Sequence, residues 1–370
     1  MTFEFATSGK IVFGNGTLAQ AVPAATGFGS SVLFVTGRNP DRAAPLLDAL
    51  RAESVACEIF SVSGEPTVET ARQAAGFSAD VVIGFGGGSV IDLAKAAAAL
   101  MTNPGDPLDY LEVIGKGLPL TERPAPCIAI PTTAGTGAEV TKNSVLASPV
   151  HKVKVSMRHP LMIPDLAIVD PECTLSMPPA VTASTGLDAL TQLLEAFISK
   201  KANSMTDGFC REGLPRAVRS LRRAFKNGDD LAAREEMAVA SLFGGLALAN
   251  AGLGAVHGFA GPLGGMFSAP HGLVCAALLP HVMKANLAAM DDLSRLEEFA
   301  RMTGGATAEE GIDWLGKLCR DLQVPPLASL GITEADFPAI VEKSKNASSM
   351  KGNPVELTDA ELMRVLRDAL

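Results

Sequence analysis

Two histidines and an aspartate in the second half of the chain have the side-chain types of a metal site. The 370 residues include five histidines, and His257 and His271 stand close together in a stretch of small residues and turn formers. Asp188 lies in an apolar segment, where a carboxylate needs a partner because an isolated buried charge is costly, and Gln192 shares its helical face. These side chains suit a divalent metal ion with an open position. A salt bridge at Asp188 beside structural histidines is the alternative.

A glycine-rich stretch in the first half has the pattern of a phosphate-binding turn. The apolar run 81–83 leads to the triplet Gly86 to Gly88, and Ser89 opens a helical segment over 90–101. Such a turn lets backbone N–H groups and the helix dipole approach an anion. Because Ser89 stands where a dinucleotide fingerprint has its third glycine, the pattern leaves the cofactor open. A tight turn without a ligand is the alternative.

The elements that carry these residues change in type near residue 180. Before it, buried strands are expected over 31–36, 56–61, 81–85, 127–131 and 166–170, and helices over 42–51, 68–75 and 90–101. This alternation predicts a parallel sheet covered on both faces. Phe3–Phe5 and Lys10–Phe13 are expected to form a hairpin around Ser8-Gly9, whose edge is a candidate dimer contact.

After Pro178-Pro179 the pattern becomes helical. Segments of helical spacing cover 183–199, 231–250 and 274–290, and glycine and proline breaks argue against one straight helix through both His257 and His271. The sequence thus predicts an α/β nucleotide-binding domain with a parallel sheet at 1–178 and an all-helical metal and substrate domain at 179–370.

Composition excludes several classes of function. The net charge is −9 with scattered lysines and arginines, so no basic surface for nucleic acid is expected. The N-terminus shows no signal pattern, and no apolar run approaches the ~18 residues of a membrane span. The six cysteines are far apart and form no C-x-x-C pair, which favours buried thiols in a reducing cytoplasm.

Six segments in register resemble the iron-containing, or group III, alcohol dehydrogenase family over nearly the whole chain. They are Gly86–Lys95, Pro131–Thr141, Ile163–Pro171, Thr185–Thr191, Pro270–Gly272 and Leu279–Met283. The resemblance implies a dehydroquinate synthase-like architecture and interconversion of a small alcohol with its aldehyde or ketone. It also implies NAD or NADP and a divalent metal ion, Fe²⁺ or Zn²⁺, and a homodimer is expected.

The resemblance assigns roles by position. It implies that Asp188, His257 and His271 are metal ligands and catalytic residues, with Gln192 completing the metal shell. The coenzyme-binding residues it implies are Gly37, Arg38, Gly86, Gly87, Gly88, Ser89, Asp92, Thr132, Thr133, Thr136 and Lys154.

Three departures from the family pattern affect these roles. Gln192 stands where the family has a histidine ligand, and Gly261 replaces a second family histidine. A glutamine carbonyl is a weaker ligand than imidazole, so metal is expected to bind less tightly, and the missing imidazole enlarges the pocket. Gly37-Arg38 stands where family members that use NAD commonly have an acid, which favours NADP or dual use.

Three other functions stay open at this stage. A superfamily lyase of the dehydroquinate synthase type would need more cationic groups than the stretch around His257 and His271 offers. A maleylacetate-type reductase would likewise want a cation near the metal. The two missing histidines also fit a catalytically inactive nucleotide-binding homologue.

Overall fold

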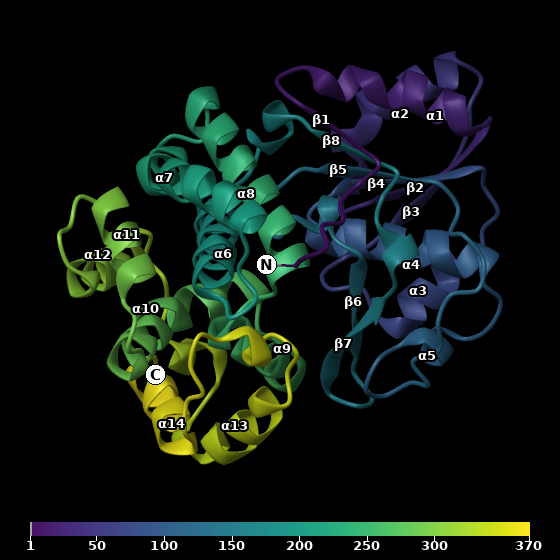
Figure 1. The fold of residues 1–370 in the computed structure, drawn as a ribbon. Coiled ribbons are helices and arrows are strands. Elements are labelled where there is room, and N and C mark those ends of the chain that lie inside the picture. Colours follow the sequence, from purple (N-terminus) through teal and green to yellow (C-terminus); the bar gives the residue numbers. More distant parts are fainter. Residues whose placement is uncertain (1) are drawn as a thin grey trace. The chain divides into compact units, whose positions relative to one another are not determined.

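The computed structural model describes residues 2–370, which form two compact units. The sheet unit comprises residues 6–133 and 137–174, and the helical unit comprises residues 2–5, 134–136 and 175–370. Figure 1 shows the strands β1–β8 and helices α1–α5 in the first of these and α6–α14 in the second. The division after residue 178 that the sequence suggests stays a prediction.

The sheet unit contains both a large parallel sheet and a small hairpin. Its strands are β1 (Lys10–Phe13), β2 (Ser31–Thr36), β3 (Ala56–Ser61), β4 (Val81–Gly86), β5 (Cys127–Pro131), β6 (Asn143–Ser148), β7 (Val153–Arg158) and β8 (Leu166–Val169). Its helices are α1 (Ala21–Phe28), α2 (Ala44–Ala52), α3 (Val68–Ala74), α4 (Gly88–Thr102) and α5 (Pro107–Tyr110). Six strands pair in the order β1-β8-β5-β4-β2-β3, all parallel, and β6 pairs antiparallel with β7.

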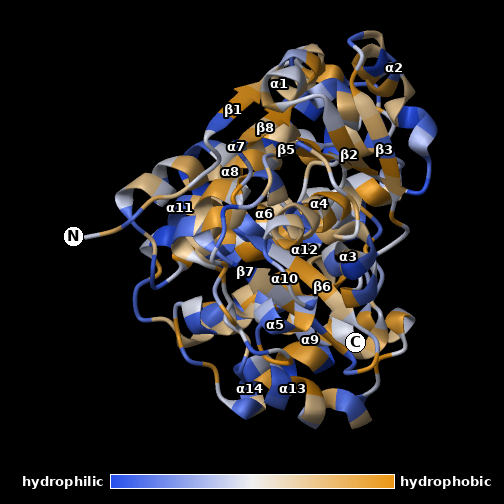
Figure 2. Cartoon of the chain, turned by 90° about the vertical axis from the view of Figure 1, so that its right-hand side faces the viewer, coloured by the Kyte–Doolittle hydropathy of each residue, from blue (hydrophilic) through white to orange (hydrophobic). Residues whose placement is uncertain are grey.

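Alternation along the strands explains why helices cover both faces of this sheet. Val32 and Phe34 belong to one core, which contains buried residues of α1 and α2. Leu33 and Val35 point to the opposite face and belong to the core that includes α3 and α4. The strands are mostly orange in Figure 2 because residues that are buried on either face are apolar. The predicted parallel α/β sheet is confirmed.

The expected N-terminal hairpin is wrong. Residues 2–8 form no strand, and β1 pairs in parallel with β8, which comes more than a hundred residues later; Lys10 lies opposite Leu166. The Phe5 ring instead stacks on Phe209, with ring centroids 5.6 Å apart, so this half-buried apolar residue packs against a helix rather than against a neighbouring strand. The hairpin edge proposed as a dimer contact therefore does not exist.

The helical unit packs around one central helix. Its helices are α6 (Pro179–Ile198), α7 (Ser204–Lys226), α8 (Leu231–Ala251), α9 (Ala255–Phe267), α10 (His271–Ala289), α11 (Ser294–Met302), α12 (Ala308–Asp321), α13 (Phe337–Lys345) and α14 (Asp359–Asp368). Figure 1 shows α6 beside α7 and α8, and α10 also packs on it. Nearly every residue of α6 from Gly186 onward is buried, so polar side chains on it must find partners inside the unit.

One described helix, α10, has the length and apolar composition of a membrane span. Half of its apolar stretch is buried within the protein, and the core helix of a folded domain can have the same length and composition. The helices α8 and α9 reach such a length and apolar composition only when taken together, and a bend of 97° separates them. Length and composition are therefore weak evidence for a span here.

Candidate metal and coenzyme sites

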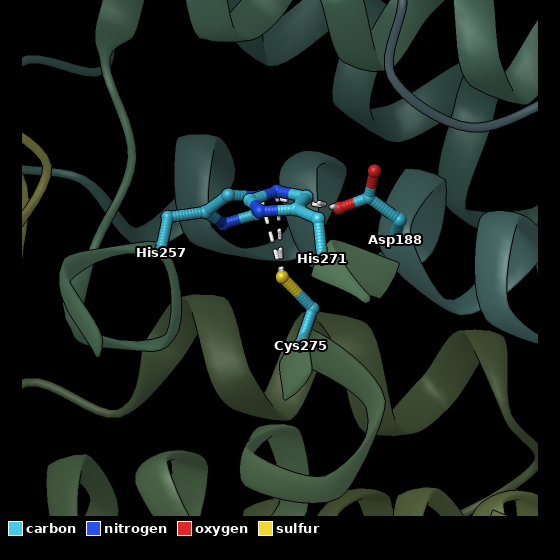
Figure 3. Close-up of side chains that lie close together, drawn as sticks. All are labelled: Asp188, His257, His271 and Cys275. Carbon is cyan, nitrogen blue, oxygen red and sulfur yellow. Dashed lines mark hydrogen bonds and ion pairs between the residues drawn. The ribbon is translucent and has the colours of Figure 1, made fainter. Parts of the chain in front are cut away.

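Four side chains from three helices of the helical unit converge on one point. Asp188 lies in α6, His257 in the first turn of α9, and His271 and Cys275 lie one turn apart at the start of α10. One donor atom from each, a carboxylate oxygen, two imidazole nitrogens and a thiol sulfur, lies within 4.8 Å of all the others. Figure 3 shows the two rings beside the Asp188 carboxylate, with the Cys275 sulfur facing them. We call this set the Asp–His–His–Cys cluster.

The helix breaks explain how both histidines reach the cluster. α9 ends at Phe267, where Ser268 adopts a left-handed conformation with φ 52°, and α10 starts anew at His271. The histidines therefore lie on different helices, as the glycine and proline residues between them predict. Their ring centroids are 5.3 Å apart.

The donor atoms lie at ligand-like separations. Nε2 of His257 is 3.2 Å from Oδ1 of Asp188, and Nε2 of His271 is 3.7 Å from the same oxygen. The side chains of Asp188 and His257 are buried, whereas that of His271 is 35% exposed, so the cluster opens to its surroundings at His271. A buried carboxylate facing two imidazole nitrogens is a suitable donor set for a divalent cation, and the residues present fit the metal that the resemblance implies.

Glu195 orients His257, a role that the sequence reasoning missed. Its carboxylate accepts a hydrogen bond from Nδ1 of His257 at 2.7 Å and from the backbone N–H of Val256 at 2.6 Å. The carboxylate therefore also neutralises the N-terminus of α9. With Nδ1 donating to Glu195, Nε2 is the nitrogen that faces Asp188, and it becomes available to a metal ion once its own proton is lost. The spacing of seven residues between Asp188 and Glu195 on α6 is the signal that could have revealed it.

Gln192 lies next to the cluster but presents a donor to it. Its Nε2 donates to Oδ2 of Asp188 at 3.4 Å, and a Cβ at Gly244 would lie 3.1 Å from its Oε1. That Oε1 is buried and has no hydrogen-bond partner within residues 2–370. The second departure, Gly261, has open space where a Cβ would be, because no atom lies within 4 Å.

Electrostatics in the cluster favour positive charge on the imidazoles. Burial lowers the pKa of His257 and of His271, but the Cys275 thiolate and Asp188 outweigh it and raise both pKa values above the usual range. Burial likewise opposes ionisation of Asp188 and Cys275, yet the two histidines lower the pKa of each. By contrast, burial raises the pKa of Cys127 and of Cys319 to about 12. The Asp188 carboxylate and the Cys275 thiolate are thus two anions that attract cationic charge to the cluster.

Most of the predicted coenzyme residues lie together at the carboxyl edge of the large sheet. β2 ends at Thr36 beside Phe85 of β4, so Gly37 and Arg38 follow next to the glycine turn. β5 ends at Pro131 opposite Gly86, and the N–H of Thr132 donates to the Gly86 carbonyl at 2.9 Å. Ligands of open α/β sheets bind at this edge.

The glycine turn leaves the start of α4 accessible to a ligand. A Cβ at Gly86 would lie 2.5 Å from Cγ2 of Val90, so only glycine fits between the strand end and the helix. Gly87 is the N-cap of α4, with no side chain capping the helix, and Ser89 lies in its first turn. Free N–H groups and the positive end of the α4 dipole therefore face the edge where Thr132 and Thr133 lie.

Three other predicted coenzyme residues have different surroundings. Asp92 forms an ion pair with Lys95 at 3.0 Å and accepts from the Val145 N–H, and burial raises the pKa of its carboxyl. Lys154, on β7, pairs with Glu65 at 3.1 Å. Thr136 belongs to the short segment 134–136 of the helical unit.

An α/β unit with a phosphate-type turn and a helical unit with a metal-type cluster together define a metal-dependent, nucleotide-linked enzyme. Residues 8–171 match the family model "Iron-containing alcohol dehydrogenase", and residues 182–370 match "Fe-containing alcohol dehydrogenase family, C-terminal". The chain belongs to the iron-containing alcohol dehydrogenase family. It is a metal-dependent, nicotinamide-linked oxidoreductase that interconverts an alcohol and its aldehyde or ketone.

Relatives and solved structures agree with this membership. Long-chain-alcohol dehydrogenase 1 of Geobacillus thermodenitrificans (strain NG80-2) is 36% identical over 335 residues, which cover 86% of this chain and 84% of that protein. The crystal structure of a 1,3-propanediol oxidoreductase is similar with a TM-score of 0.94 at 33% identity and covers 100% of both chains. A sulfoacetaldehyde reductase from Bifidobacterium kashiwanohense, solved in complex with NAD⁺, has a TM-score of 0.89 at 30% identity and covers 100% of this chain and 99% of its own.

Proposed function

We propose that Asp188, His257 and His271 hold the divalent metal ion and that this chain acts on a small, uncharged alcohol or aldehyde. The observation that carries the proposal is the approach of both Nε2 atoms to Oδ1 of Asp188, at 3.2 and 3.7 Å. When bound, the ion would supply Lewis acidity toward the substrate oxygen. The 35% exposure of His271 supports substrate access from that side.

The residues around the cluster have separate tasks in this proposal. Glu195 holds His257 with Nε2 toward Asp188, and Gln192 fixes the second oxygen of Asp188, so Oδ1 is held in place. The absence of lysine and arginine among residues 250–275 supports a neutral substrate rather than an acidic one.

We also propose that the coenzyme diphosphate binds at the start of α4 and that NADP is preferred. The first point is supported by the glycine turn and the free helix N-terminus, the second by Gly37 and the exposed Arg38 at the same sheet edge. Arg38 is held by two hydrogen bonds to Ser63, at 2.6 and 3.0 Å, and its remaining N–H groups suit a 2′-phosphate. Asp92 supports the turn through its pair with Lys95. The proposed contacts are Gly37, Arg38, Gly86, Gly87, Gly88, Ser89, Thr132, Thr133, Thr136 and Lys154.

A cytoplasmic location and a homodimer complete the proposal. All six cysteines are free, which suits a reducing compartment. β1 is an end strand of the large sheet, with β8 as its partner on one side, and such an edge can pair with a second copy.

Substitution of the histidines tests the metal assignment. His257→Ala and His271→Ala are each expected to abolish aldehyde-dependent oxidation of NADPH and NADH while leaving the circular dichroism spectrum unchanged. His151→Ala, at an exposed histidine of the sheet unit, is the matched control and should retain activity. Full activity of His271→Ala would contradict the assignment, and coenzyme binding without turnover in the unaltered protein would indicate an inactive homologue.

A further inference from the structure

The fourth corner of the cluster is occupied by a thiol. Cys275 is fully buried, and its Sγ lies 3.8 Å from Nε2 of His257 and 3.7 Å from Nε2 of His271. Both distances are those of hydrogen bonds between a sulfur and an imidazole nitrogen. The same two nitrogens face Asp188, so the sulfur shares the centre on which the other three donors converge.

We infer that Cys275 is the fourth protein ligand of the metal site and that the resulting carboxylate, two imidazoles and thiolate select Zn²⁺ over Fe²⁺. This inference rests on the proposed function, because it takes Asp188, His257 and His271 as the other ligands. Cys275 then supplies the donor that Gln192 cannot, from a different helix.

Four of the six separations between the donor atoms are close to those of a tetrahedron around zinc. With metal–nitrogen distances of about 2.0–2.1 Å and a metal–sulfur distance of about 2.3 Å, nitrogen and sulfur ligands lie about 3.6 Å apart, and nitrogen and oxygen ligands about 3.4 Å apart. The corresponding distances here are 3.7 and 3.8 Å to the sulfur, and 3.2 and 3.7 Å to the oxygen. For these four pairs, shifts of a few tenths of an ångström reach the expected separations, and the other two pairs lie within 4.8 Å of each other.

Gln192 is a positioning residue in this arrangement rather than a ligand. The end of its amide that faces Asp188 is the nitrogen, at 3.4 Å from Oδ2, and an amide N–H₂ has no lone pair to offer a metal. A reversed amide would place two oxygen acceptors 3.4 Å apart and leave the N–H₂ against Gly244. The hydrogen bond from Gln192 thus holds Oδ2 and leaves Oδ1 of Asp188 for the metal.

The donor chemistry sets the preference for zinc. Two imidazoles and a carboxylate with open positions suit Fe²⁺, whereas a thiolate is a soft ligand that favours Zn²⁺ and tolerates its tetrahedral geometry. Zn²⁺ also binds to most nitrogen and sulfur sites more tightly than Fe²⁺ does. Coordination would displace to solvent the protons that these imidazole and thiol groups carry without a metal, because the ligands are neutral imidazole nitrogens and a thiolate. A substrate oxygen would join as a fifth ligand, which zinc sites accommodate.

X-ray absorption at the zinc edge of the whole protein tests the inference without any variant. We expect one sulfur scatterer at about 2.3 Å and nitrogen or oxygen scatterers at about 2.0–2.1 Å. A shell of nitrogen and oxygen alone would overturn it. Replacement of zinc by Co²⁺ gives a second readout, because a thiolate-to-cobalt charge-transfer band is expected and its absence would also contradict the inference.

Three matched variants extend the test to affinity. Cys275→Ala is expected to weaken zinc binding by at least ~100-fold in chelator competition, because losing a metal ligand lowers affinity more than losing an outer-shell partner does. The same variant should weaken Fe²⁺ binding less than it weakens zinc binding. Cys319→Ala, at another buried cysteine, should leave zinc affinity unchanged, and Gln192→Leu should cost only about 10-fold. Unchanged zinc affinity in Cys275→Ala, or a larger loss in Gln192→Leu, would refute the thiol ligand.

Failure of the inference is distinguishable from failure of the proposed function. If zinc binding survives in both His257→Ala and His271→Ala, the metal binds elsewhere, and both the inference and the proposed function are wrong. If those variants lose zinc while Cys275→Ala keeps it, the site stands with three protein ligands and only the inference falls. If Cys275→Ala does not fold, the absorption spectrum of the unaltered protein still decides.

Discussion

Replacement of Glu195 by glutamine isolates the effect of one buried hydrogen bond on metal binding. The glutamine has nearly the same shape, but only one of its two terminal atoms accepts. Val256 N–H and Nδ1 of His257 each need an acceptor, at 2.6 and 2.7 Å, on different oxygens of the glutamate. If the new N–H₂ faces His257, the ring must accept at Nδ1 and carry its proton on Nε2, which then cannot bind a metal.

The size of the effect follows from the burial of this pair. The Glu195 side chain is 0% exposed and that of His257 is 6% exposed, so solvent does not screen the bond. A charge-assisted hydrogen bond contributes about 1.5–3 kcal/mol, which agrees with the 10- to 100-fold loss of metal affinity, or about 1.4–2.7 kcal/mol, typical for outer-shell partners. Glu195→Gln is therefore expected to weaken zinc binding by about 10- to 100-fold.

Competition with a chromophoric chelator measures this loss directly. Glu298→Gln, which removes a carboxylate from a surface pair with Arg211, is the control and should bind zinc as the unaltered protein does. Circular dichroism verifies that α9 persists after the change. Unchanged zinc affinity in a folded Glu195→Gln protein would refute the argument that Glu195 sets the tautomer of His257.

The remaining predictions concern the sheet unit. Gly37→Asp places a carboxylate where no atom lies within 4 Å of a Cβ, so the fold should persist and the ratio of kcat/KM for NADPH to that for NADH should fall by at least ~10-fold; an unchanged ratio would contradict the coenzyme proposal. Gly86→Ala forces a Cβ to 2.5 Å from Val90 and should cost about 1–3 kcal/mol in the free energy of unfolding. Burial raises the pKa of Glu139 from 4.5 to about 7, so the folded protein holds a proton that the unfolded chain has released, and stability falls by up to about 3 kcal/mol as pH rises through that window. Glu139→Gln should flatten this part of the profile in denaturant titrations at pH 4 to 8, and an equal slope in both proteins would contradict it.

The sequence predicts the parallel sheet well because its signal is local. Runs such as 32–35 and 81–85 are apolar throughout, which is what burial on both faces requires, and the glycine turn directly follows the second of them. The N-terminal hairpin fails because the partner of β1 is β8, and no local pattern shows a pairing across such a separation. The β6–β7 hairpin was not predicted, since its alternating buried and half-buried residues include many small polar side chains.

The site was predicted in part for a similar reason. Asp188 and the two histidines stand out by residue type. Cys275 does not, because buried cysteines among apolar neighbours are common and most of them are inert. Only the start of α10 at His271 shows that the histidine and the cysteine, four residues apart, share a face directed at Asp188. Gln192 could be recognised as a departure, but not the direction of its amide.

Metal reconstitution tests the central claim most directly. The protein is stripped with a chelator, and aldehyde-dependent oxidation of NADPH and NADH is measured before and after addition of Zn²⁺ or Fe²⁺, with His271→Ala in parallel. We expect no turnover in the stripped protein, recovery on addition of metal, and no recovery in His271→Ala. Turnover that persists without metal, or that returns equally in His271→Ala, would contradict a metal-dependent dehydrogenase built on Asp188, His257 and His271.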